Sequence, residues 1–177
     1  MNKKTLITVL SALVVILFGI GITVSFLLAS SQPVINTFTV GSVEIELRET
    51  TGSKYKLIPG ADIKKDPVVT VLAGSEESWL FVKIEKQNNF DSFFLFKVDS
   101  SWSALPSHNG VYYQKVPSAL NNMRYQVLEN DSVHVKETVT ESQLSEINAN
   151  PKLNVTAYAI QSDGLESAHD AWREIEG

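Results

Sequence analysis

The stretch Val43-Glu44-Ile45-Glu46-Leu47-Arg48 carries the pattern that decides the fold class. Its apolar residues alternate with charged ones, so the apolar side chains point to one side of an extended chain and the charges to the other. A helix would spread the same apolar residues around its circumference, because its period is 3.6 residues rather than two. The stretch is therefore predicted to be a β-strand with one buried and one solvated face.

Further short segments of the chain are predicted to be strands. In one of them, Trp79–Lys86, the side chains of Leu80, Val82 and Ile84 should point into the core. The others are Pro67–Ala73, Phe93–Val98, Val111–Val116, Arg124–Leu128, Ser132–Val139 and Leu153–Gln161. In Phe93–Val98 apolar side chains fall on both faces, which predicts a strand covered on both sides.

Turn-forming residue pairs separate these segments. They are Pro59-Gly60, Gly74-Ser75, Asn88-Asn89, Asn109-Gly110, Asn121-Asn122 and Asn130-Asp131. Short strands with such frequent turns predict an all-β fold, an antiparallel β-sandwich that is jelly-roll-like or of Greek-key type.

Two short helices are expected in the C-terminal half. Thr140-Glu141-Ser142-Gln143 fits a capping box, and the helix that follows should present Leu144 and Ile147 and end before Pro151. A second helix should begin near Asp163, whose carboxylate can cap it. Its apolar face is formed by Leu165, Ala168, Ala171, Trp172 and Ile175, with Trp172 buried against the sheet.

The first thirty residues indicate export. Lys3 and Lys4 precede the apolar stretch Leu6–Ala29, and no charge occurs from Thr5 to Val43. As a helix, that stretch would be about 36 Å long, enough to cross a hydrocarbon core of about 30 Å. The two lysines hold the N-terminus inside, so the rest of the chain is expected to be translocated.

The small residues Ala29, Ser30 and Ser31 form the predicted signal-peptidase region, because Ala29 and Ser31 have the spacing that this enzyme recognises. Residues 1–31 are therefore predicted to be a cleaved signal peptide, with retention as a membrane anchor as the alternative. Residues 32–177 should form a single β-sandwich domain. The membrane is expected to be contacted only through the N-terminal segment.

The charge balance excludes a generic nucleic-acid binder. Lys3 and Lys4 are the only charges in residues 1–31, so 13 of the 15 basic residues and all 20 acidic residues lie in the exported part, a net charge of −7. Nucleic-acid binding needs a basic face that displaces counterions from phosphates. The chain has no Cys, so the exported part is expected to fold without disulfides.

Three segments of the chain resemble the TasA and camelysin family. They are Asn36–Leu47 (NTFTVGSVEIEL), Leu57–Pro67 (LIPGADIKKDP), and Ala157–Gly164 (AYAIQSDG) followed by Ala171-Trp172. The resemblance implies a jelly-roll protein exported with a dedicated signal peptidase in Firmicutes, related to the major protein fibre of biofilm matrix. It also implies a secreted or cell-surface location and a partner that is either another copy of the chain or another matrix protein.

No catalytic, cofactor-binding or metal-binding residue is predicted. The three histidines, His108, His134 and His169, are far apart in sequence, and no pair lies one helical turn apart with a glutamate between them, as in common zinc peptidases. Without Cys, thiol chemistry is excluded. The chain is therefore expected to be a structural protein rather than an enzyme, with an exported camelysin-type metal-dependent peptidase as the alternative.

The segment after the predicted cleavage site is the expected assembly element. Gln32–Val40 is uncharged and β-prone, and it runs into the first strand of the domain. Such a segment can pair with a strand edge of a neighbouring subunit, or within its own domain. The side chains expected to take part are Val34, Ile35, Thr37, Phe38 and Val40.

Overall fold

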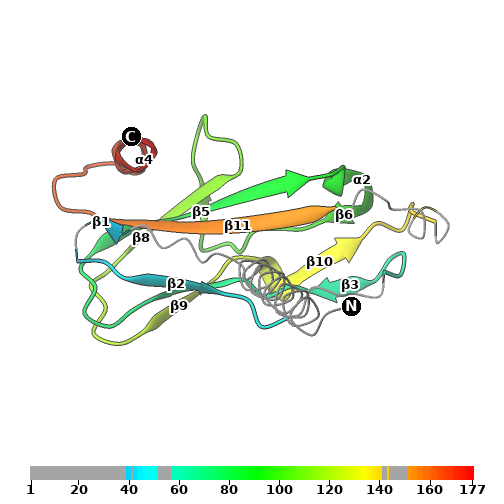
Figure 1. Cartoon of the computed structure of the whole chain (residues 1–177), viewed down its shortest axis with the longest axis horizontal. Helices are drawn as coiled ribbons and strands as arrows, with labels where there is room; N and C mark the ends of the chain where they lie inside the picture. Colours follow the sequence, from blue (N-terminus) through cyan, green and yellow to red (C-terminus); the bar gives the residue numbers. More distant parts are fainter. Residues whose placement is uncertain (1–38, 41, 52–56, 141–142, 144–150) are drawn as a thin grey trace, which may run out of the picture. The chain divides into compact units, whose positions relative to one another are not determined.

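The computed structural model of the chain describes residues 39–40, 42–51, 57–140, 143 and 151–177 (Figure 1). All of them lie in the compact unit Ile35–Gly177. Strands make up most of the regular secondary structure of this unit, which confirms the predicted all-β class.

The largest sheet has five strands. Their order across the sheet is β1 (Thr39–Val40), β11 (Lys152–Gln161), β5 (Ser78–Gln87), β8 (Val111–Val116) and β7 (Ser103–Ala104). Neighbouring strands are antiparallel except for β1, which runs parallel to β11. The parallel pair departs from the antiparallel arrangement expected from sequence, because β1 and β11 come from opposite ends of the domain and meet without a hairpin.

Two three-stranded sheets lie across the core from the five-stranded one (Figure 1). One contains β2 (Ile45–Arg48), β4 (Val68–Val71) and β9 (Met123–Gln126), and the other β3 (Asp62–Lys64), β10 (Ser132–Val135) and β6 (Phe94–Leu95). The chain joins the two sheets twice, from β3 to β4 and from β9 to β10. Between the two sheets lies the short 3-10 helix η1 (Glu129–Asp131), where the amide of Lys65 donates to the carbonyl of Asp131 at 2.7 Å.

The main core lies between these layers. Leu80, Val82 and Ile84 of β5 point into it, as predicted, and are at most 5% exposed. On the opposite side, Val69 and Val71 of β4 are fully buried. The alternating pattern therefore predicted correctly which face of β5 points into the main core.

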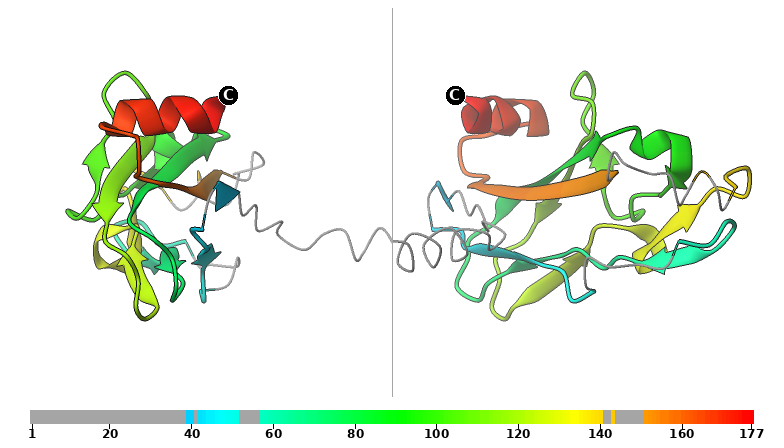
Figure 2. Two further views of the ribbon diagram at one scale, coloured as in Figure 1. Left: turned by 90° about the vertical axis from the view of Figure 1, so that its left-hand side faces the viewer. Right: turned by 45° about the vertical axis from the view of Figure 1, so that its right-hand side comes forward.

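Helix α4 (Ala168–Glu176) covers part of the outer face of the five-stranded sheet (Figure 2). Ala171 and Trp172 are buried against this sheet, as expected. The predicted start at Asp163 was wrong. Gly164 adopts a φ of +74°, which turns the chain, and the Ser167 hydroxyl caps the helix by accepting the amide proton of Asp170 at 3.1 Å.

The predicted strand Phe93–Val98 was mostly wrong. A short helix, α2 (Phe90–Phe93), occupies its start, only Phe94–Leu95 forms a strand, β6, and Val98 makes an isolated bridge with Leu128. The rings of Phe90 and Phe94, one helical turn apart, pack with centroids 5.0 Å apart and are both buried, whereas Leu95 is 52% exposed. Phe90 and Phe94 therefore have the spacing of one helical turn. Because Leu95 is exposed, strand β6 is not covered on both sides.

The predicted capping box is present. The Thr140 amide donates to Oε1 of Gln143, and the Gln143 amide donates to the Thr140 hydroxyl. Leu144 and Ile147, on the helix expected to follow, lie outside the described residues. Most predicted turns are also confirmed, since Gly60, Gly74, Gly110 and both residues of Asn88-Asn89 and Asn130-Asp131 have positive φ.

The Asp66 carboxylate, just before β4, is hydrogen-bonded to Thr50 and Thr51, which follow β2. It accepts hydrogen bonds from the amides of Thr50 and Thr51, at 3.0 and 2.9 Å, and from both of their hydroxyls. These bonds, the Thr50 hydroxyl first, hold the pKa of the Asp66 carboxyl well below its usual range.

Asp66 is therefore expected to make the fold acid-sensitive. A depressed pKa contributes stability at pH values above the unfolded-state pKa of about 3.9, and this contribution is lost as the pH falls below that value. Asp66→Asn should flatten the rise of unfolding free energy with pH between about 2 and 4. Urea unfolding at several pH values measures this change in slope. The control is Asp163→Asn, because Asp163 is an exposed residue of the turn between β11 and α4. An identical pH slope in wild type and Asp66→Asn would contradict the assignment.

Candidate functional site

One edge of β11 is open among the described strands. All ten residues of β11 pair with β5, whereas β1 covers only Ala159 and Ile160 on the other side. No described strand pairs with Lys152–Ala157 on that side. In a strand with a neighbour on one side only, alternate residues point their N–H and C=O groups away from that neighbour. The stretch therefore offers hydrogen-bonding groups to a further strand.

The side chains of this stretch do not discourage pairing. Leu153 and Ala157 are buried, Val155 packs against the main core, and Asn154 is exposed. From Leu153 to Ala157 there is no charge, and the only local charge is Lys152 at the end of the strand. Edge strands are commonly protected by charged residues or proline, so an uncharged edge of this length is open to β-augmentation.

Strand β1 indicates which segment reaches this edge. Thr39 lies opposite Ala159, and Val40 lies opposite Ile160, in parallel register. Of the residues predicted to take part in assembly, Val40 is in β1. Val34, Ile35, Thr37 and Phe38, together with the signal-peptidase residues Ala29, Ser30 and Ser31, lie outside the described residues. Sequence analysis did not identify β11 as the acceptor, although the uncharged run in Leu153–Ala157 was a signal for it.

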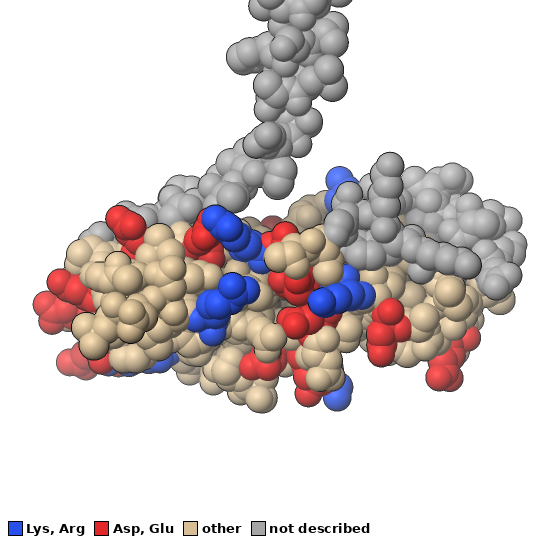
Figure 3. Space-filling model, turned by 90° about the horizontal axis from the view of Figure 1, so that it is seen from below, with Lys and Arg blue, Asp and Glu red and all other residues tan. Residues whose placement is uncertain are grey.

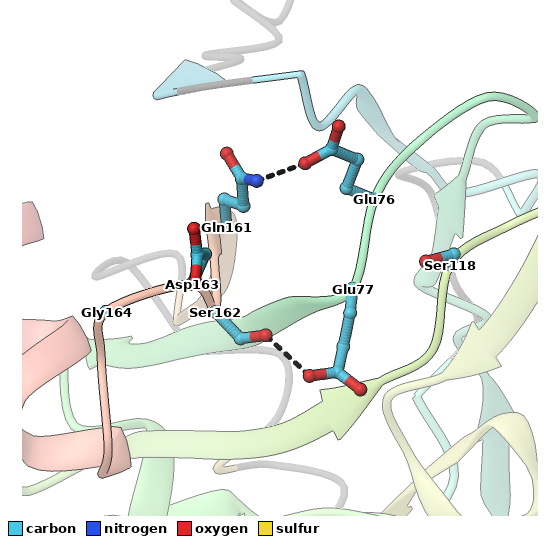
Figure 4. A pocket seen from close by; sticks show the side chains of 7 residues that line it. All are labelled: Glu76, Glu77, Ser118, Gln161, Ser162, Asp163 and Gly164. Carbon is cyan, nitrogen blue, oxygen red and sulfur yellow. Dashed lines mark hydrogen bonds between the residues drawn. The ribbon is translucent and has the colours of Figure 1, made fainter.

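An open hollow lies where β11 ends and β5 begins (Figure 4). Glu76 accepts a hydrogen bond from the side-chain Nε2 of Gln161, and Glu77 accepts one from the Ser162 hydroxyl at 2.7 Å. The hydrogen bond from Lys115, 2.7 Å away, lowers the pKa of Glu77. Glu77 is therefore ionised at neutral pH and suited to joining the strand ends rather than to general acid catalysis. The hollow is lined by Glu76, Glu77, Ser118, Gln161, Ser162, Asp163 and Gly164.

His134 lies on the solvent side of β10, as its position between Val133 and Val135 predicts. Its Nδ1 is 2.8 Å from a carboxylate oxygen of Asp62 on the neighbouring strand β3. This contact is a cross-strand pair within one sheet, and it gives Nδ1 of His134 a protein partner.

The other two histidines meet at helix α4, which the sequence did not predict. The His108 ring, from the β7–β8 loop, lies 5.4 Å from the His169 ring by centroids. His108 Nε2 is 3.7 Å from a carboxylate oxygen of Glu176. Sixty residues of chain separate the histidines, so no local pattern could reveal the contact.

In the described part of the chain, no group of three or more His, Asp or Glu side chains could hold a metal ion. The face formed by β2, β4, β9 and the neighbouring sheet carries both signs of charge, interspersed (Figure 3). Arg48 pairs with Glu46, and Lys65 with Glu49, on this side of the molecule. A mixed face of this kind is not suited to following a phosphate backbone.

No helix in the part of the chain that the structure describes has the length and apolar character needed to cross a bilayer. No protein-family model, curated protein or solved structure matches this chain.

Proposed function

We propose that this protein is a secreted or cell-surface structural protein of an extracellular matrix, such as that of a biofilm, which assembles through strand edges. It would be a fibre-forming or accessory subunit with a jelly-roll-like β-sandwich, as its resemblance to the TasA and camelysin family suggests. The single observation that supports assembly is the uncharged edge of β11 next to β1, which no described strand covers at Lys152–Ala157.

The proposed mechanism is addition of a strand to this edge. After export and removal of residues 1–31, the segment Gln32–Val40 of one copy leaves its own domain and adds to β11 of the next, where it replaces that copy's own segment. Continuing the parallel register of β1 sets Thr37 opposite Ala157 and Ile35 opposite Val155. Directly opposed residues point to the same face of a sheet, so Ile35 takes the side on which Val155 packs against the core. Backbone hydrogen bonds give the affinity and Ile35 the specificity.

Removal of Gln32–Asn36 is expected to abolish assembly while leaving the exported domain folded. The measurement is electron microscopy and light scattering of the exported protein, whose N-terminus is determined by mass spectrometry. A variant in which Gly and Ser replace these five residues keeps the length of the segment and should also fail to assemble, because it lacks Ile35 and the β propensity.

Two point variants test the register. Ile35→Asp places a charge on the core side and should abolish fibres or oligomers, whereas Asn36→Asp places it on the solvent side and should leave assembly intact. Equal assembly with and without the segment, or assembly by neither form, would rule out this mechanism. Equal loss in both point variants would reject the register.

A further inference from the structure

Three aromatic side chains form a row across the five-stranded sheet, on the outer face that α4 covers (Figure 2). Tyr113 of β8 lies opposite Phe81 of β5, and Phe81 lies opposite Tyr158 of β11. The ring of Trp172 packs onto this row, with its centroid 5.1 Å from that of Phe81 and 5.4 Å from that of Tyr158. Among the described strands the row ends at Tyr158, because β1 pairs only with the two residues that follow it.

The register of β1 determines which residue would continue this row. Thr39 lies opposite Ala159, and β1 runs parallel to β11. A strand that extended β1 backwards by one residue would set Phe38 opposite Tyr158. Directly opposed residues point to the same face of a sheet, so this register would direct the Phe38 side chain to the face that carries the aromatic row.

The side chains on the outer face match in chemistry along this register. Phe38 would lie opposite the aromatic Tyr158, and the polar Asn36 would lie opposite the polar Thr156. A slip of one residue would set Phe38 opposite the buried Ala157 and turn both Phe38 and Asn36 to the core face. The match therefore favours continuation of the β1 register over its neighbours.

We propose that Phe38 packs on Tyr158 at the edge of β11 and that this aromatic pair selects the strand that adds there. The occupant is the segment Gln32–Val40, whose last two residues form β1. The proposal rests on the assembly proposed above: in a fibre Phe38 comes from the neighbouring copy, and in a single domain it comes from the same chain. Aromatic pairs contribute more than the apolar area they bury, so Phe38 gives specificity on the outer face, as Ile35 does on the core face.

A double-mutant cycle on the exported protein tests the contact. Urea unfolding is measured at a protein concentration too low for assembly. The change in unfolding constant caused by Phe38→Ala should be roughly threefold to tenfold smaller in a Tyr158→Ala background than in wild type. Tyr113→Ala is the matched control, because Tyr113 belongs to the same row but lies two strands away, and it should leave the effect of Phe38→Ala unchanged. If Tyr158→Ala is unfolded by circular dichroism, Tyr158→Leu takes its place in the cycle.

Light scattering distinguishes this proposal from the assembly on which it rests. If the exported protein assembles, Phe38→Ala should raise the concentration needed for assembly at least about threefold, whereas Phe38→Tyr should assemble like wild type. If wild type does not assemble, the proposed function fails, but the cycle still decides the pair, because the segment then has only its own β11 to join. Additive losses in Phe38→Ala and Tyr158→Ala, or equal assembly by wild type and Phe38→Ala, would overturn the pair.

Discussion

Replacing Trp172 with alanine should lower the free energy of unfolding by about 3 to 5 kcal/mol. Trp172 is 2% exposed, and its ring packs against those of Phe81 and Tyr158, with centroids 5.1 and 5.4 Å away. Removing the indole leaves a cavity between α4 and the five-stranded sheet, which the remaining small residues Ala168 and Ala171 cannot fill. Urea denaturation followed by circular dichroism measures the loss.

Arg173→Ala is the control for Trp172→Ala. The Arg173 side chain is exposed and pairs only locally with Asp170, so its removal should change stability by no more than about 0.5 kcal/mol. If Trp172→Ala unfolds at the same urea concentration as wild type, α4 does not pack on the sheet in solution.

Gly110→Ala should destabilise the fold by about 2 to 4 kcal/mol. Gly110 has a φ of +78°, and a Cβ there would lie 2.5 Å from the backbone oxygen of Ile84. The same pair of residues is joined by a hydrogen bond from the Ile84 amide to the Gly110 carbonyl at 2.8 Å. The added methyl group therefore forces the start of β8, which follows Gly110, away from β5. The Ile84 oxygen belongs to the backbone, so it cannot turn aside as the end of a flexible side chain could.

Gly74→Ala separates the two contributions at Gly110. Gly74 has a φ of +93°, but a Cβ there meets nothing within 4 Å, so only the conformational cost of about 1 to 2 kcal/mol is expected. Thermal unfolding of both variants gives the difference that is due to the clash. Equal losses would show that the β7–β8 loop moves freely away from β5.

Local pattern predicted much of the fold. Alternation identified β5 and its inward residues Leu80, Val82 and Ile84, and the candidate strand Val111–Val116 has the observed ends of β8. The helical spacing of Ala168, Ala171 and Trp172 identified the buried face of α4. These predictions succeeded because burial of one face follows directly from the period of the backbone.

Competition between neighbouring local signals caused the errors. Asp163 and Ser167 can both cap a helix, and the turn at Gly164 decides for Ser167. The phenylalanines after Asn89 fit a strand and a helical turn, and packing of Phe90 on Phe94 decides for α2. In each case the two conformations differ little in local free energy, so tertiary packing selects one.

The sequence by itself determined the all-β class, most of the turns, the buried faces of β5 and α4, and the net charge of the chain. Only the tertiary structure decided that β1 joins β11 in parallel, which leaves Lys152–Ala157 open among the described strands, and that His108 meets His169. The physical reason is that periodicity and turn chemistry act over a few residues. These contacts join segments 61 to 120 residues apart, and the packing of the whole domain determines which of them form.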